Sequence, residues 1–179
     1  RQPILQSPNR EFALGLTAAR RESEISSDVL ADFGYPASLL SPGADEDGDT
    51  RISAVQFFQE WTQRNTREVI AARSQVNLGV GAFDATINNN APDSRFFSWQ
   101  GQAQWVRLLA PDTLFLLRTN VQIANDPLVP LEQFGVGGLE SVRGYRQDAL
   151  LSDGGLFASA ELRIPVYRVP ERQLTLQVT

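Results

Sequence analysis

The sequence predicts an all-β protein, a fragment of an antiparallel transmembrane β-barrel with one very long loop. Three observations favour this fold class. Apolar and polar residues alternate with period two along most of the chain, which is typical of strands with one apolar face. The polar positions in these segments are mostly Gln, Asn, Ser, Thr and Gly rather than Lys and Glu. The connections alternate between long and short.

Composition narrows the functional classes. The 179 residues are 42% hydrophobic and 21% charged, which suits one domain, and the net charge of −5 argues against a nucleic-acid partner. Cysteine and histidine are absent, which removes disulfides, thiolate metal sites and the usual general base, so we expect neither an enzyme nor a cofactor. Methionine is also absent, even at position 1, and we expect an internal piece of a longer protein. No apolar run approaches the roughly 20 residues of a membrane helix.

The alternation predicts six strands and the start of a seventh. They cover residues 11–25, 51–62, 68–83, 96–109, 113–124, 156–165 and 173–179. The second strand is the least regular, because Ile52 and Ala54 have the opposite parity from Val55, Phe57 and Trp61. A β-bulge near Ala54 would reconcile the two sets.

The segment 96–109 indicates a wet interior. Trp99 and Trp105 share its apolar face, as the fringes of an aromatic belt, and Ser and Gln occupy the other face. Such a polar row suits a water-filled barrel better than the core of a soluble β-sandwich, which is the alternative fold. The predicted lumen-lining residues are Arg73, Gln75, Gln100, Gln102, Arg118, Gln122 and Arg163.

Connection lengths predict the topology. The successive connections are long (26–50), short (63–67), long (84–95), short (110–112), very long (125–155) and short (166–172). Outer-membrane barrels show this pattern, with long loops outside and short turns in the periplasm, whereas a sandwich has no reason to alternate so. Because about eight strands are the minimum for closure, we expect strands from the rest of the protein to cover both edges.

The acidic run 45–49 (Asp-Glu-Asp-Gly-Asp) suggests a calcium loop, but it departs from the template. The template requires Gly at its sixth position and Glu at its twelfth, where this chain has Thr50 and Gln56. We therefore expect a solvated loop and no metal site.

Two segments carry a resemblance to a known family: 137–145 (Gly-Gly-Leu-Glu-Ser-Val-Arg-Gly-Tyr) and 158–165 (Ala-Ser-Ala-Glu-Leu-Arg-Ile-Pro). The chain resembles the POTRA-barrel superfamily of outer-membrane protein translocators, and most of all its two-partner secretion transporters of the haemolysin-activator type. The resemblance implies a monomeric 16-stranded barrel that follows periplasmic POTRA domains. Its location would be the outer membrane of a Gram-negative-type bacterium or a related organelle envelope. Residues 125–155 would be the sixth extracellular loop, folded back into the lumen.

The resemblance also assigns a motif to this loop. The motif residues are Gly137, Gly138, Val142, Arg143, Gly144 and Tyr145. By resemblance, Arg143 enters the lumen and pairs with acidic groups on the following strands, of which Glu161 matches the first. The parity of its strand also predicts that Glu161 faces the lumen.

The predicted function is a protein-conducting pore in the outer membrane. It would export a secreted cargo protein in an extended form, without ATP and without catalysing any reaction, while its apolar face contacts the lipid bilayer. One alternative is a barrel-assembly factor of the same superfamily. A soluble β-sandwich with a binding or hydrolytic role is a further alternative, which the absence of histidine disfavours.

Overall fold

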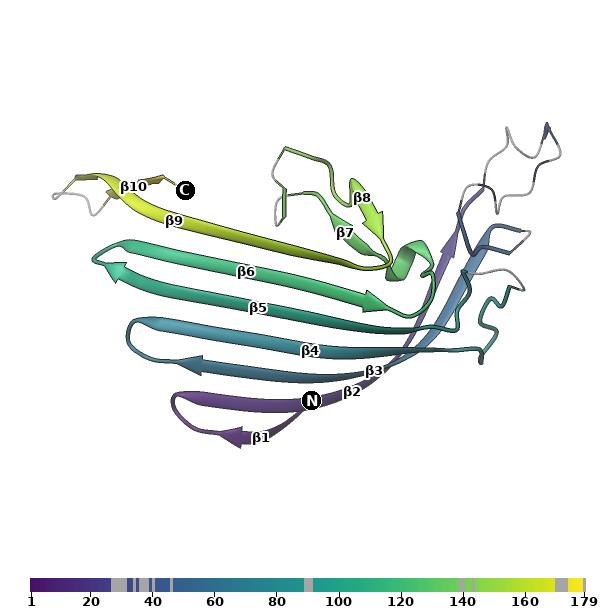
Figure 1. Ribbon diagram of the computed structural model, residues 1–179, viewed down its shortest axis with the longest axis horizontal. Coiled ribbons are helices and arrows are strands. Elements are labelled where there is room, and N and C mark those ends of the chain that lie inside the picture. The colour runs from purple at the N-terminus through teal and green to yellow at the C-terminus, as the bar shows by residue number, and fades with distance from the viewer. Residues whose placement is uncertain are drawn as a thin grey trace.

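The computed structural model describes residues 1–26, 32, 33, 35, 39, 41–45, 47–88, 92–138, 141, 142, 144–169 and 174–178. They form an antiparallel sheet of eight strands that curves into a half-barrel (Figure 1), with the order β1-β2-β3-β4-β5-β6-β9-β10. A separate two-stranded sheet contains β7 and β8. The all-β, antiparallel barrel fold predicted from the sequence is confirmed.

The strands of the large sheet are long and follow one another in sequence. Their bounds are β1 Gln2–Gln6, β2 Arg10–Glu24, β3 Asp49–Arg64, β4 Glu68–Val80, β5 Phe97–Ala110, β6 Thr113–Ala124, β9 Gly155–Val169 and β10 Leu174–Val178. The prediction of six strands and the start of a seventh omitted β1, a five-residue segment in which Pro3 obscures the alternation. In β1 the register with β2 shifts between Pro3 and Leu5, as expected for proline in a strand that occupies the edge of the described sheet.

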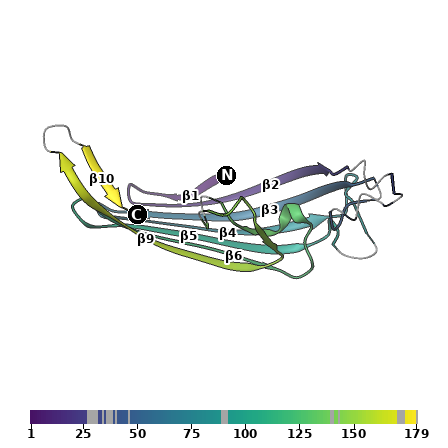
Figure 2. The same cartoon turned by 90° about the horizontal axis from the view of Figure 1, so that it is seen from above.

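Short and long connections lie at opposite ends of the sheet. The turns 7–9, 65–67 and 111–112 are at one end, and the connections 25–48, 81–96 and 125–154 leave from the other (Figure 1). Seen from above, the strands lie side by side in a single layer (Figure 2). The turn 65–67 is closed by Asn65, whose Oδ1 accepts hydrogen bonds from the backbone N–H groups of Arg67 and Glu68, both at 2.9 Å.

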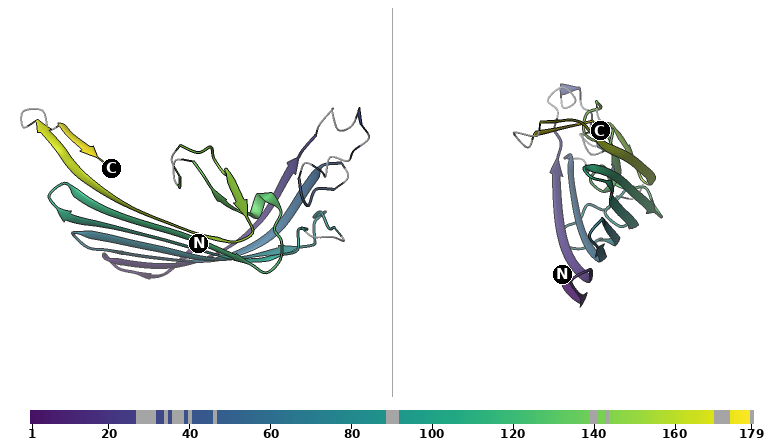
Figure 3. Two further views of the ribbon diagram at one scale, coloured as in Figure 1. Left: turned by 45° about the horizontal axis from the view of Figure 1, so that its top comes forward. Right: turned by 90° about the vertical axis from the view of Figure 1, so that its left-hand side faces the viewer.

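The two faces of the sheet differ in character. Figure 3 shows the β7–β8 hairpin over the hollow of the curved sheet, and we call this the concave face. Because the register is unbroken from β2 to β4, residues of one parity share a face across these strands. Large apolar side chains are exposed on the other, convex face: Leu16, Phe57, Trp61, Leu78, Phe97, Ile123, Leu156, Leu162 and Ile164.

The predicted bulge near Ala54 is wrong. β3 pairs with β2 through fifteen consecutive partners, from Asp49 to Gln63, without a register shift. Ile52 and Ala54 instead face the concave side, where they are buried in an apolar cluster with Phe96, Leu128 and Val129. Their opposite parity therefore reflects a second apolar contact, because loop residues cover this end of the concave face.

The connection 125–154 is more ordered than the predicted loop over 125–155. It contains the 3-10 helix η2 (Pro130–Glu132) and the strands β7 (Phe134–Val136) and β8 (Leu150–Ser152), which pair with each other. Within the described ranges, no helix has the length and apolar character that crossing a membrane requires.

The strand predicted over 156–165 continues as β9 to Val169, into the range 166–172 predicted as a turn. Pro165 is accommodated within β9, opposite the point where β10 shifts register.

Candidate functional site

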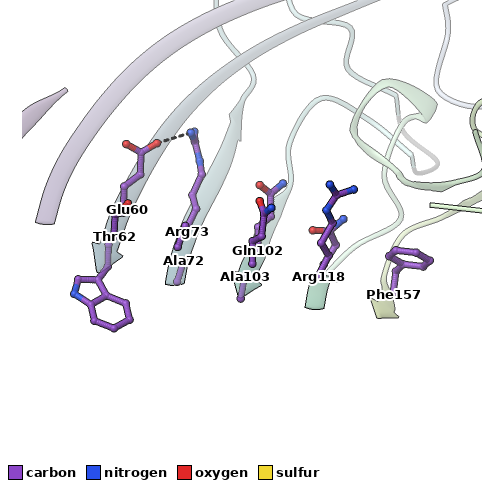
Figure 4. A pocket seen from close by; sticks show the side chains of 12 residues that line it. Glu60, Thr62, Ala72, Arg73, Gln102, Ala103, Arg118 and Phe157 are labelled. Atoms are coloured by element: carbon purple, nitrogen blue, oxygen red, sulfur yellow. Dashed lines mark hydrogen bonds and ion pairs between the residues drawn. The ribbon is translucent and has the colours of Figure 1, made fainter. Parts of the chain in front are cut away.

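The concave face is the candidate functional site, because its middle is lined by hydrogen-bonding and charged side chains. Seven residues predicted to line the lumen have the parity of this face: Arg73, Gln75, Gln100, Gln102, Arg118, Gln122 and Arg163. Figure 4 shows Arg73, Gln102 and Arg118 pointing to the same side of the sheet, away from Ala72 and Ala103. Their role in lining a lumen stays a prediction.

A charged network occupies the face near the short turns. Glu60 Oε1 accepts a hydrogen bond from Arg73 Nη1 at 2.8 Å, and Arg73 Nη2 donates to Gln75 Oε1 at 2.6 Å. Arg1 Nε also donates to Glu60, at 2.7 Å to Oε2. Glu60 was not among the predicted site residues. The predicted turn over 63–67 was too long to pair the two residues, whereas the observed turn at 65–67 pairs Arg64 with Val69 and, further along, Glu60 with Arg73.

The aromatic ring of Phe58 lies within this polar surface. The Arg73 guanidinium carbon is 4.3 Å from the centroid of the Phe58 ring, a cation–π contact. Phe58 pairs in register with Gly15, and a Cβ on Gly15 would lie 2.0 Å from Phe58 Cζ. The ring therefore occupies the space that any other side chain at Gly15 would fill. Its contact with the Arg73 guanidinium helps to orient that side chain over the concave face.

Neutral amides replace the charges towards the long loops. Gln75 Nε2 donates to Asn77 Oδ1 at 2.6 Å, and Asn77 Nδ2 donates to Ser98 Oγ at 3.1 Å. Gln100 Nε2 donates to Gln122 Oε1 at 2.7 Å. Asn77 and Ser98 are fully buried, so their hydrogen bonds offset the cost of removing these groups from water.

The structure describes only part of the predicted loop motif. Arg143 lies outside the described residues, so its pairing with Glu161 stays a prediction. Glu161 has the parity of the concave face, and its Oε2 is 3.4 Å from Arg163 Nη2.

The rest of the motif is described. Gly137, Gly138 and Gly144 have φ angles of 140°, 86° and 98°, which favour glycine. Val142 and Tyr145 have exposed side chains.

The base of the connection 125–154 is bound to the concave face. Asp153 Oδ1 accepts hydrogen bonds from the Leu128 backbone N–H at 2.9 Å and from Gln133 Nε2 at 3.0 Å. Gln122 Nε2 donates to the backbone oxygens of Glu132 and Asp153 at 2.9 and 3.1 Å. Of these residues the sequence had pointed only to Gln122, because the others lie in a segment without periodicity.

The Glu132 carboxylate is the most deeply buried charge at this base. It pairs with the Arg21 guanidinium of β2, which lies on the concave face. Burial raises the pKa of Glu132 above its ordinary value of 4.5, although the positive charge and hydrogen bond of Arg21 act in the opposite direction.

The described residues show no chemistry beyond hydrogen bonding and charge. Among them, no group of three or more His, Cys, Asp or Glu could hold a metal ion. In the acidic run, Asp45 Oδ1 accepts hydrogen bonds from the backbone N–H groups of Asp47 and Asp49, at 3.2 and 2.8 Å. This carboxylate oxygen is used within the turn itself.

Comparisons with known proteins agree with the fold. The family described as haemolysin secretion/activation protein ShlB/FhaC/HecB matches residues 46–179. The solved structure of CdiB from Escherichia coli superposes with a TM-score of 0.71 at 17% sequence identity, over 94% of this chain and 30% of that chain. The chain thus spans about 30% of the length of that relative, and at this identity the likeness shows the fold alone. No match was found among curated proteins.

Proposed function

The chain belongs to the ShlB/FhaC/HecB family of haemolysin secretion/activation proteins, and we propose that it forms part of an outer-membrane pore that exports a partner protein. The pore would act in two-partner secretion, and the cargo would cross in an extended form. No reaction is catalysed, and no ATP is consumed.

The observation that carries this proposal is the contrast between the two faces of the half-barrel. The concave face presents amides and paired charges such as Gln102 and Arg73, whereas the convex face exposes large apolar side chains such as Leu156 and Ile123. A soluble sheet would bury its apolar face and expose its polar one. The reverse arrangement suits a barrel with lipid outside and water inside.

The convex face also supports a membrane setting. Trp105 and Phe115 pack edge to face near the short turns, with ring centroids 5.6 Å apart. Trp105 Nε1 donates a hydrogen bond to Glu68 Oε2 at 3.3 Å, so the polar end of the indole points towards the end of the sheet. Aromatic residues with one apolar and one wet side are typical of the membrane interface.

The concave face suits the passage of an unfolded chain. An extended polypeptide carries unpaired backbone N–H and C=O groups, and amides such as Gln100 and Gln102 both donate and accept hydrogen bonds. Neutral amides form weaker hydrogen bonds than ionised groups, so they exchange partners readily as a chain moves past. A hollow of about 470 Å³ lies along this part of the face, between Glu60 and Phe157.

Reconstitution of the full-length protein into lipid vesicles tests the proposal. The partner protein that the pore exports, added unfolded outside the vesicles without ATP, should become protected from protease. Vesicles without the transporter are the control. Loss of protection, or a requirement for ATP, would contradict the proposal.

An experiment in the producing cells separates export from barrel assembly. Deletion of the gene should abolish secretion of the partner and leave the other outer-membrane barrels at normal abundance. A general loss of outer-membrane barrels would instead indicate an assembly factor.

A further inference from the structure

The base of the β6–β9 loop reaches across the concave face to β2. The loop leaves β6 at Ala124, and eight residues later the carboxylate of Glu132 pairs with Arg21 of β2. The sheet order places β3, β4 and β5 between β2 and β6. At about 4.8 Å per strand, β2 and β6 are about 19 Å apart along the sheet, and the pair connects the loop that leaves β6 with β2. The Glu132 backbone oxygen also accepts a hydrogen bond from Gln122 Nε2 of β6 at 2.9 Å, so Glu132 is held from both β6 and β2.

The other long connections pack against this crossing. Val129 is fully buried against Ile52 and Ala54, and a Cβ on Gly43 would lie 2.6 Å from Val129 Cγ1. Gly43 belongs to the β2–β3 connection, and its backbone oxygen accepts a hydrogen bond from Asn88 Nδ2 of the β4–β5 connection at 3.0 Å. All three long connections therefore meet at the same end of the concave face.

The ion pair gives the loop base a directional contact with β2, which the apolar contacts do not provide. Apolar burial is non-directional, and the hydrogen bond from Gln122 to Glu132 holds the base only to β6, so the ion pair is the directional contact to β2. The Glu132 side chain is only 3% exposed, and a buried carboxylate is stable only beside a partner that meets it in a fixed geometry. The partner is 111 residues earlier in the chain, on a different strand, so the contact fixes one residue of the loop to one position on the wall.

We propose that Arg21 and Glu132 are a positioning pair, which fixes the base of the β6–β9 loop across the long-loop end of the lumen and keeps it there during transport. The inference rests on the proposed function. It concerns the loop base, and it is independent of the predicted contact of Arg143. Neither Arg21 nor Glu132 needs to contact the cargo.

Hydrogen exchange of the full-length protein in vesicles tests the positioning. Arg21→Ala leaves Glu132 buried without its partner, so exchange of the peptide 126–133 should increase by about 5- to 150-fold. Arg20→Ala is the matched control, because Arg20 is the adjacent residue on the convex face and pairs with the exposed Glu22. Its exchange should equal that of the wild type.

A variant in which the two charged residues are swapped distinguishes a positioning pair from a general packing effect. Arg21→Glu combined with Glu132→Arg should recover part of the protection that each single variant loses. Equal exchange in the wild type and Arg21→Ala would overturn the proposal. The same holds for a double variant no better protected than the single ones.

A covalent tether tests whether the base stays in place. Arg21→Cys and Glu132→Cys, joined by a short bifunctional thiol reagent, lock the loop where the ion pair holds it; these 179 residues contain no other cysteine. Secretion by the tethered protein should match that of the same protein after reduction. Secretion that stops on tethering and returns on reduction would show that the base must move, and would overturn the proposal. Absence of secretion even in the wild type would instead refute the proposed function, and the exchange measurement would still decide the positioning.

Discussion

A single arginine placed on either face of β6 tests which face meets lipid. Thr119 lies on the convex face and pairs with Ala103 and Ala158, which are too small to shield a guanidinium. Thr119 is six residues beyond Thr113, the start of β6, or about 20 Å along the strand at ~3.4 Å per residue. A tilt of about 40° projects this to about 15 Å, close to the middle of an apolar band about 25 Å tall.

Thr119→Arg should therefore destabilise the barrel by about 2–4 kcal/mol, the cost of arginine near the bilayer midplane. Asn120→Arg is the matched control, because it carries the same charge one residue along on the concave face, and it should cost less than about 1 kcal/mol. Both are measured as urea-induced unfolding of the full-length protein in lipid vesicles. Equal costs for the two variants, or a larger cost for Asn120→Arg, would refute the assignment of the faces.

Three further predictions concern the concave face and its loop. Gly15→Val should destabilise the barrel by about 1–3 kcal/mol in the same urea assay, because its side chain overlaps the Phe58 ring; an unchanged midpoint would contradict this packing. Hydrogen exchange of the loop base, corrected for intrinsic rates, should slow as the pH falls from 7 towards 4.5. When the loop base is packed on the sheet, burial raises the pKa of Glu132, so the packed base binds a proton more tightly than a base that has come away. Lower pH therefore favours the packed base. Glu132→Gln should remove this dependence, and a dependence that persists in that variant would assign it to another group. Arg143→Ala should lower secretion while insertion of the barrel stays normal, and unchanged secretion at normal protein level would contradict its predicted role.

Local patterns were sufficient to predict the long strands β2 to β6 and β9 and their faces, although they missed the short strands β1, β7 and β8. Period-two alternation depends only on neighbouring residues, because side chains of a strand point to alternate faces. It placed Gln100 and Gln102 on the face opposite Trp99 and Trp105, as the register between β5 and β6 shows. Hairpin geometry extends this reach across a short turn only when the turn is placed correctly: the predicted turn 63–67 is two residues longer than the observed one, so it missed the contact between Glu60 and Arg73.

Contacts between distant segments were not predictable in this way. The parity of Ile52 suggested a bulge, because nothing near it in sequence indicates that Val129 covers the concave face there. Arg21 lies in the charged run 20–24, where nothing in the local pattern points to Glu132, its partner 111 residues away. A salt bridge of this kind depends on the curvature of the whole sheet, and residue pattern alone carries no such information.

The central claim is that the concave face lines the path of the exported protein. A photo-cross-linking amino acid at Gln102, compared with one at Ala103 on the opposite face, tests this claim during secretion of a cargo stalled by a folded domain at its end. A concave face that lines this path should give a cross-link from position 102 to the cargo and none from position 103. Equal cross-linking at the two positions, or a cargo adduct at position 103 alone, would contradict it.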